Sequence, residues 1–197
     1  MSHQIHNPVD QISGRWTMDD LRALNALAIR LCRDATAQDE FSFLRLSPGW
    51  RQFFSGLTDE KAASCYSNLP ISLLKVVGIP AWSQIKNGVE VDADRSPIER
   101  TYVFRHLLFC REIADFNPVA MRVISGFSGA DFLVLRRCTV SQLDTLSGAA
   151  ALHIQPQFEF SESLVSKLSP GWVGKEILFR LPSLLAPAAV PELVRAK

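Results

Sequence analysis

Two short stretches of this 197-residue chain hold residue types that could do chemistry. Ser128 is the centre of Gly-Phe-Ser-Gly-Ala at 126–130, which approaches the Gly-x-Ser-x-Gly turn that exposes a nucleophilic serine. Ala130 replaces the second glycine and no strand is expected before the turn, so we expect Ser128 to cap a helix. His106 and Cys110 have the spacing of a metal-binding pair on one helix face, but no further ligands accompany them. We expect neither catalysis nor a bound cofactor or metal.

The four cysteines are spread along the chain without a Cys-x-x-Cys pair, at Cys32, Cys65, Cys110 and Cys138. A structural zinc site usually gathers its ligands on short turns, and this spacing does not provide such turns. We expect reduced thiols that are buried in the core.

Composition and charge narrow the class of protein. Apolar residues make up 47% and charged residues 21% of the chain, which is typical of globular proteins. The net charge is only +1, whereas a domain that binds nucleic acid alone usually has an excess of positive charge. We expect any DNA contact to be weak or shared with a more basic partner. No apolar run is long enough to span a membrane and the first residues do not resemble an export signal, so we expect a cytoplasmic protein.

Helix start signals recur along the chain, and apolar residues at three- and four-residue steps follow several of them. The expected N-cap residues are Thr17, Ser47, Thr58, Ser128, Thr139 and Ser169. The Thr139 signal is a capping box with Gln142, and apolar residues follow at Val140, Leu143 and Leu146. A long helix is expected from Ile98, with a break at 117–118. Short strands are expected within 70–77, 89–91, 152–154 and 158–160.

The order of these signals occurs twice. With an offset of 81 residues Ser47 aligns with Ser128 and Thr58 with Thr139, so the two caps are eleven residues apart in both halves. We predict a mainly α fold of two tandem helical units with short β segments, related by a pseudo-twofold axis. The expected parts are a flexible N-terminus (1–16), a first unit (17–77), a connector (78–97), a second unit (98–160), and a C-terminal helix with a Pro-rich tail (161–197).

The second unit resembles the FlhD family, the small subunit of the flagellar master activator. The family's motifs have counterparts at 120–122, at Gly126-Phe127, in the Cys-Thr-Val-Ser-Gln-Leu stretch at 138–143, and in Phe-Glu-Phe at 158–160. The first unit is similar at 46–47 and 57–61, with Lys61 in place of the glutamine, and the two units together cover about half of the chain. Two FlhD-like units in one chain would correspond to a dimer of the family.

The resemblance implies a non-enzymatic transcriptional activator subunit that acts on DNA together with a larger FlhC-like zinc-binding partner. Its targets would be conjugative or motility genes. The fused units, the acidic connector and the added tail depart from the family, so its DNA-contacting residues do not transfer one by one. The alternative is a helical scaffold or adaptor of a secretion or conjugation system that makes no DNA contact, and a homo-oligomer also stays open.

The pair of helices expected within 128–147 could form a helix-turn-helix that opens its second helix at Thr139. That helix has no Lys or Arg, which most recognition helices supply, and Arg136 and Arg137 have an alternative role as cations at a helix C-terminus. Trp50 and Trp172 each follow Ser-Pro-Gly, and each is either a partner-binding residue or a core anchor. The candidate DNA contacts are Arg136, Arg137, Thr139, Ser141, Gln142, Lys167 and Lys175.

Overall fold

The computed structural model describes residues 18–38, 44–57, 60–69, 71–116 and 118–161. Its helices are α1 (Met18–Gln38), α2 (Pro48–Gly56), α3 (Glu60–Ser67), α4 (Trp82–Asn87), α5 (Pro97–Phe116), α6 (Pro118–Ser125), α7 (Gly129–Leu135) and α8 (Val140–Ser147). Its strands are β1 (Leu74–Val77) and β2 (His153–Pro156). The expected mainly α class is confirmed.

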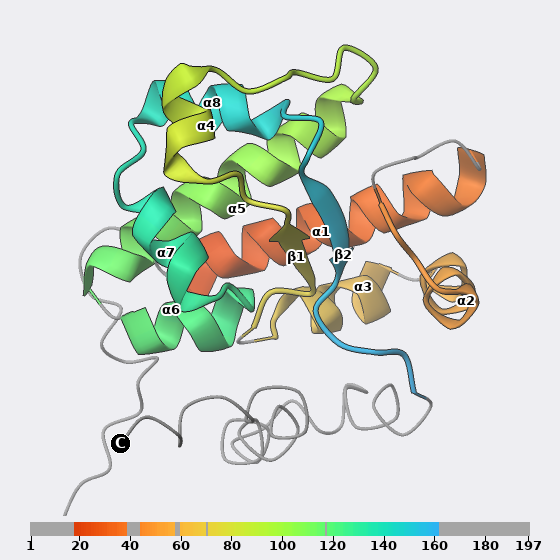
Figure 1. The fold of residues 1–197 in the computed structure, drawn as a ribbon. Coiled ribbons are helices and arrows are strands. Elements are labelled where there is room, and N and C mark those ends of the chain that lie inside the picture. The colour runs from red at the N-terminus through yellow and green to blue at the C-terminus, as the bar shows by residue number, and fades with distance from the viewer. Residues whose placement is uncertain (1–17, 39–43, 58–59, 70, 117, 162–197) are drawn as a thin grey trace, which may run out of the picture.

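The two long helices α1 and α5 pack against each other at the centre of the molecule (Figure 1). The short helices α2 and α3 pack on α1, while α6, α7 and α8 pack on α5. The leucines of the α1 stripe, such as Leu21 and Leu31, are buried, and so are Tyr102 and Leu107 of α5. The amphipathic spacing of the two long helices therefore places the core between them.

Three of the expected N-caps lie within the described residues, and all three are confirmed. Ser47, Ser128 and Thr139 each adopt an extended backbone and accept a hydrogen bond from the backbone N–H three residues later. Such a bond satisfies one of the amide groups that the first helical turn leaves without a partner. Thr17, Thr58 and Ser169 lie outside the described residues.

The two strands form a small antiparallel sheet that joins the segment after α3 to the segment after α8. Leu74 pairs with Pro156 and Val77 with His153, and Leu44 adds an isolated parallel bridge to Ile154. The strands within 70–77 and 152–154 are therefore confirmed in part, with their bounds shifted.

The strand expected at 158–160 is wrong. The carbonyl oxygen of Phe158 accepts the indole N–H of Trp50 at 3.0 Å, and the rings of Phe158 and Phe160 pack against the core. The alternation of Phe158 and Phe160 therefore reflects packing over α2 rather than pairing with another strand.

Residues 78–97 contain a helix, α4, that the sequence analysis did not anticipate. Ile85 is buried, and the side-chain oxygen of Gln84 accepts the backbone N–H of Ala81 at 2.9 Å. The strand expected at 89–91 is reduced to an isolated bridge between Val91 and Ala149. The helix is short and the bridge is isolated, so neither produces a clear periodic pattern in the sequence. The glycines and prolines of this segment indicate turns instead.

The order of long helix, two short helices and strand occurs both as α1–α2–α3–β1 and as α5–α7–α8–β2, with α6 inserted in the second. The starts of α2 and α7 are separated by the offset of 81 residues that aligns the caps. The pseudo-twofold relation between the two units stays a prediction.

Candidate nucleic-acid interface

The α7–α8 corner, defined here as residues 133–142, is the best-formed candidate site. Tight backbone hydrogen bonds shape its turn: Arg137 N–H donates to Val134 O at 3.0 Å and Cys138 N–H to Leu135 O at 3.1 Å. Cys138 is buried and anchors the turn, and burial raises the pKa of its thiol. The corner is therefore a fixed turn between two helices, as the sequence predicted.

Both helices of the pair begin with reciprocal caps. Asp131 accepts the N–H of Ser128 at 3.0 Å, and Gln142 accepts the N–H of Thr139 at 2.8 Å. In return each cap hydroxyl accepts the backbone N–H of its partner at 3.2 Å. Ser128 therefore caps a helix as expected. Thr139 and Gln142, two of the DNA candidates, use these oxygens to stabilise the start of α8.

The two arginines of the turn are both exposed. The Arg136 guanidinium lies over the ring of Phe132, 5.7 Å from its centroid, which is a cation–π contact. Ser141 is exposed on α8 as well. The corner thus brings together five of the seven DNA candidates, and Lys167 and Lys175 lie outside the described residues.

Two large apolar side chains of the corner are also exposed, Leu133 by 58% and Val140 by 52%. Val140 shares three-residue steps with the buried Leu143 and Leu146, but each such step falls 60° short of a full helical turn. Three residues joined by two such steps therefore do not share one face. Val140 remains at the edge of the buried stripe.

Trp50, a candidate for partner binding, is 3% exposed. Its ring stacks on Phe54 with 5.5 Å between centroids, and its N–H donates to Phe158 O. This placement corresponds to the alternative of a core anchor. Trp172 lies outside the described residues.

His106 and Cys110 are both completely buried. His106 Nδ1 lies 3.2 Å from the hydroxyl of Tyr102, and burial lowers the pKa of His106 to about 3. Burial also raises the pKa of the Cys110 thiol, so both groups are neutral. In the part of the chain that the structure describes, no group of three or more His, Cys, Asp or Glu side chains could hold a metal ion.

Two buried polar residues that no sequence pattern predicted hold the segments after α3 and α8. Asn25 of α1 contacts the backbone of residues 67–73 through four hydrogen bonds, the shortest to Ile71 O at 2.8 Å. A polar residue at a core-facing step of α1 was a signal that could have revealed it.

Arg95 donates to the carbonyl oxygens of Ser147 at 3.1 Å, Ala149 at 2.9 Å and Leu152 at 2.6 Å. Burial lowers the pKa of Arg95, and the nearby carboxylate of Glu99 opposes that shift. Nothing in the residues around Arg95 marks it as buried, because it lies in a polar segment. Arg95 is buried because the fold places the end of α8 next to it, and a local sequence pattern does not show that contact.

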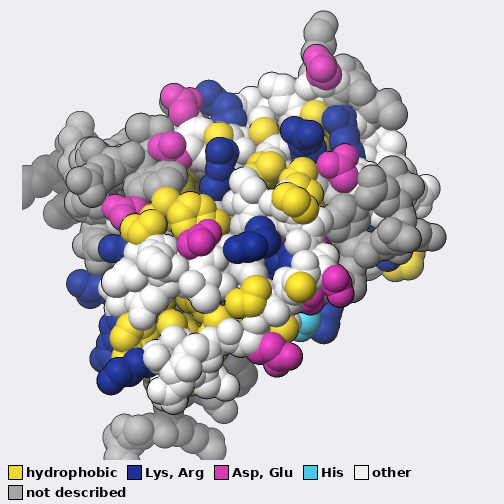
Figure 2. All heavy atoms as spheres, turned by 90° about the horizontal axis from the view of Figure 1, so that it is seen from above, with side chains coloured by type: hydrophobic (Ala, Val, Ile, Leu, Met, Phe, Trp, Pro, Cys, Tyr) yellow, Lys and Arg dark blue, Asp and Glu magenta, His cyan; other side chains and the backbone are white. Residues whose placement is uncertain are grey.

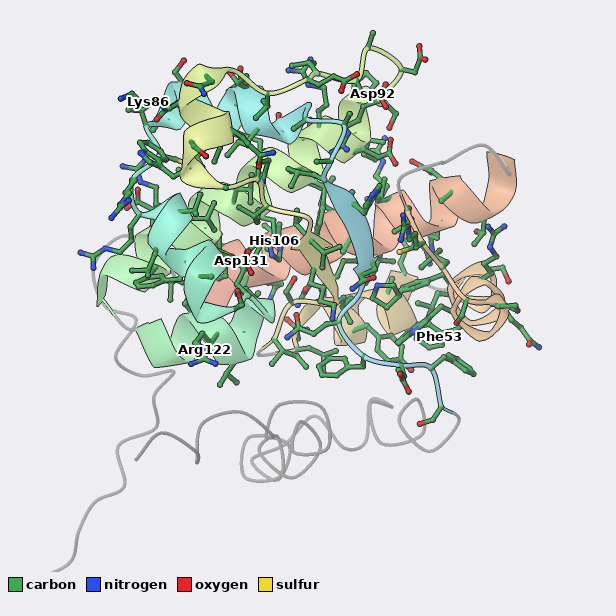
Figure 3. The ribbon with its side chains drawn as sticks, in the orientation of Figure 1. Phe53, Lys86, Asp92, His106, Arg122 and Asp131 are labelled. Atoms are coloured by element: carbon green, nitrogen blue, oxygen red, sulfur yellow. The ribbon has the colours of Figure 1, made fainter. Side chains whose placement is uncertain are left out.

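Charged side chains are mixed on the face seen from above in Figure 2, where Lys and Arg lie among acidic and apolar groups. In Figure 3, Lys86 and Arg122 lie at the periphery, whereas His106 lies in the interior. No helix of the described ranges combines the length and apolar character needed to cross a bilayer.

These features define a mainly helical protein with an exposed cationic turn between two capped helices. Comparisons of the chain with protein-family models, with curated proteins and with solved structures found no match.

Proposed function

We propose that this chain is a non-enzymatic, cytoplasmic transcriptional regulator that resembles FlhD and acts on DNA in complex with an FlhC-like zinc-binding partner. The observation that carries the proposal is the α7–α8 corner, a fixed turn between two capped helices with Arg136 and Arg137 exposed. The stretch at 138–143 that resembles an FlhD motif overlaps the second half of this corner. Conjugative or motility genes are the proposed targets.

In this proposal the two arginines contact phosphates, which would position the protein without reading the base sequence. The exposed hydroxyl of Ser141 can donate to a phosphate or a base edge. Because α8 contains no Lys or Arg and the chain has a net charge of only +1, most of the affinity must come from the partner.

Chromatin immunoprecipitation with sequencing tests the proposal, with the tagged full chain in the cells that naturally express it. We expect enrichment at a limited set of promoters and loss of the corresponding transcripts when the gene is deleted. The double variant Arg136→Ala/Arg137→Ala should lose that enrichment. The control Arg105→Ala/Arg122→Ala removes two exposed arginines elsewhere and should keep it. Absence of promoter enrichment for the unaltered chain would refute the proposal.

The second candidate function is a scaffold or adaptor without DNA contact. The exposed Leu133 and Val140 favour it, because apolar side chains suit a protein surface better than a phosphate backbone. Identification of the proteins that co-purify with the tagged chain is the experiment that distinguishes the two functions. An Arg136→Ala/Arg137→Ala variant that keeps its partners but loses promoter activation excludes a pure scaffold.

A further inference from the structure

Exposed large apolar side chains are few in the described residues, and three of them lie in two charged patches. The cationic patch is the corner, where Leu133 and Val140 flank Arg136 and Arg137. The corner itself contains no acidic residue; of the two that flank it, Asp131 accepts hydrogen bonds from Ser128 and Asp144 is exposed. The second patch contains Val91, which is 48% exposed.

The acidic patch comprises residues 90–94, in which Glu90 and Asp94 are exposed on either side of Val91. Asp92 is half-buried and lies near Arg95, whose charge the buried Glu99 offsets. The exposed Arg100 also approaches this patch beside Gly148. The patch therefore has three carboxylates and only one cation whose charge is not offset, the guanidinium of Arg100. Its net charge is negative.

The two patches lie at opposite ends of α8. Val140 is the first residue of that helix, whereas the acidic patch is hydrogen-bonded just beyond its last residue. Asp92 N–H donates to Gly148 O at 2.8 Å, and Ala150 N–H donates to Glu90 O at 2.9 Å. The eight residues of α8 span about 12 Å, so one chain holds its patches apart.

We propose that the acidic patch of one chain docks on the α7–α8 corner of a second copy. Glu90 and Asp94 would face Arg136 and Arg137, and Val91 would contact Leu133 and Val140. The charges and the apolar centres of the two patches are complementary, and the backbone anchors of both patches limit the entropy lost on docking. The proposal does not rest on the proposed regulatory function, but it uses the same two arginines, so a copy docked on the corner would exclude DNA from it.

Such a contact is head-to-tail, because two different patches meet. It leaves one unused patch at each end of a dimer, so further copies can add until a ring closes. Each patch is small, and small polar interfaces associate weakly. We therefore expect self-association at high protein concentration that decreases as salt screens the charges.

Sedimentation equilibrium of the full chain, after nuclease treatment, tests the proposal by charge exchange. The weight-average mass of the unaltered chain should rise with concentration. The variants Arg136→Glu/Arg137→Glu and Glu90→Lys/Asp94→Lys should each lose that rise when measured alone. Their equimolar mixture should regain it, because each reversed patch then meets its complement.

Two controls make the result specific. Arg105→Glu/Arg122→Glu carries the same change of charge on exposed sites of α5 and α6 and should associate as the unaltered chain does. Leu133→Ser/Val140→Ser keeps all charges and should weaken association. If circular dichroism shows that charge reversal unfolds the chain, the proposal is tested by this variant, and association equal to that of the unaltered chain would contradict it.

Three outcomes would overturn the proposal. The unaltered chain could stay monomeric at every concentration, or the charge-reversed variants could still associate alone. The third is a mixture of the two variants that fails to regain association.

Discussion

Arg95 donates a hydrogen bond of 2.6 Å to the carbonyl oxygen of Leu152, 57 residues further along the chain. Two more carbonyl oxygens from the end of α8 and the loop after it accept from the same guanidinium. Helix carbonyls at a C-terminus lack intrahelical partners, and a buried cation satisfies them. Arg95 thus fastens the segment before α5 to the end of α8.

Replacement of this guanidinium by an apolar side chain should be costly. Arg95→Met removes three donors and leaves buried carbonyl groups unsatisfied, so we expect a loss of about 3 kcal/mol or more in the free energy of unfolding. Urea unfolding followed by circular dichroism measures it. The matched variant Arg100→Met alters an exposed arginine and should change stability by less than about 0.5 kcal/mol. Equal effects of the two variants would contradict the role assigned to Arg95.

Asn25 performs a similar task for the segment after α3. Asn25→Ala should lower the free energy of unfolding by about 3 kcal/mol, because it removes four buried hydrogen bonds and opens a small cavity. The comparison is Asn68→Ala, which removes one bond from the amide of Asn68 to Ser64 O near the surface. If Asn25→Ala is no worse than Asn68→Ala in thermal or urea unfolding, the network is not a structural anchor.

His106 should make the stability of the protein depend on pH. Burial lowers its pKa to about 3, whereas the imidazole of an unfolded chain titrates near 6.5, so the unfolded state binds a proton first as pH falls. The stabilisation is complete above about pH 6.5 and decreases between there and about pH 3, with a slope approaching 1.4 kcal/mol per pH unit. Urea unfolding at a series of pH values measures this slope.

The variant His106→Asn keeps a polar atom near the position of Nδ1, which contacts Tyr102, and removes the titrating group. It should flatten the dependence within this window, whereas His153→Asn, at a half-buried site, should change it less. An unchanged slope in His106→Asn would show that other groups cause the pH dependence.

The side-chain hydrogen bonds of the helix caps should contribute to the stability of the protein. Ser128→Ala and Thr139→Ala should each destabilise the protein by about 1 kcal/mol, since each removes an acceptor for a first-turn amide. Ser141→Ala, on the exposed side of α8, should have little effect. Thermal unfolding of the three variants provides the comparison, and equal melting temperatures would show that the caps contribute nothing.

The sequence by itself determined the mainly helical class and three of the helix starts, whereas it did not reveal α4. The caps at Ser47, Ser128 and Thr139 were predictable because each hydrogen bond closes within three residues. The apolar spacing of α1 and α5 likewise placed Leu21 and Leu107 in the core, because the period of a helix fixes which side chains share a face.

The tertiary structure alone decided which distant groups meet. The bond from Trp50 to Phe158 spans 108 residues and assigns Trp50 to the core, and it replaces the strand that the alternation of phenylalanines suggested. The tertiary structure also decided that Leu133 and Val140 are exposed beside the exposed arginines of the corner. Local patterns describe each helix separately, whereas exposure depends on how neighbouring helices pack, and that packing is set by the whole chain at once.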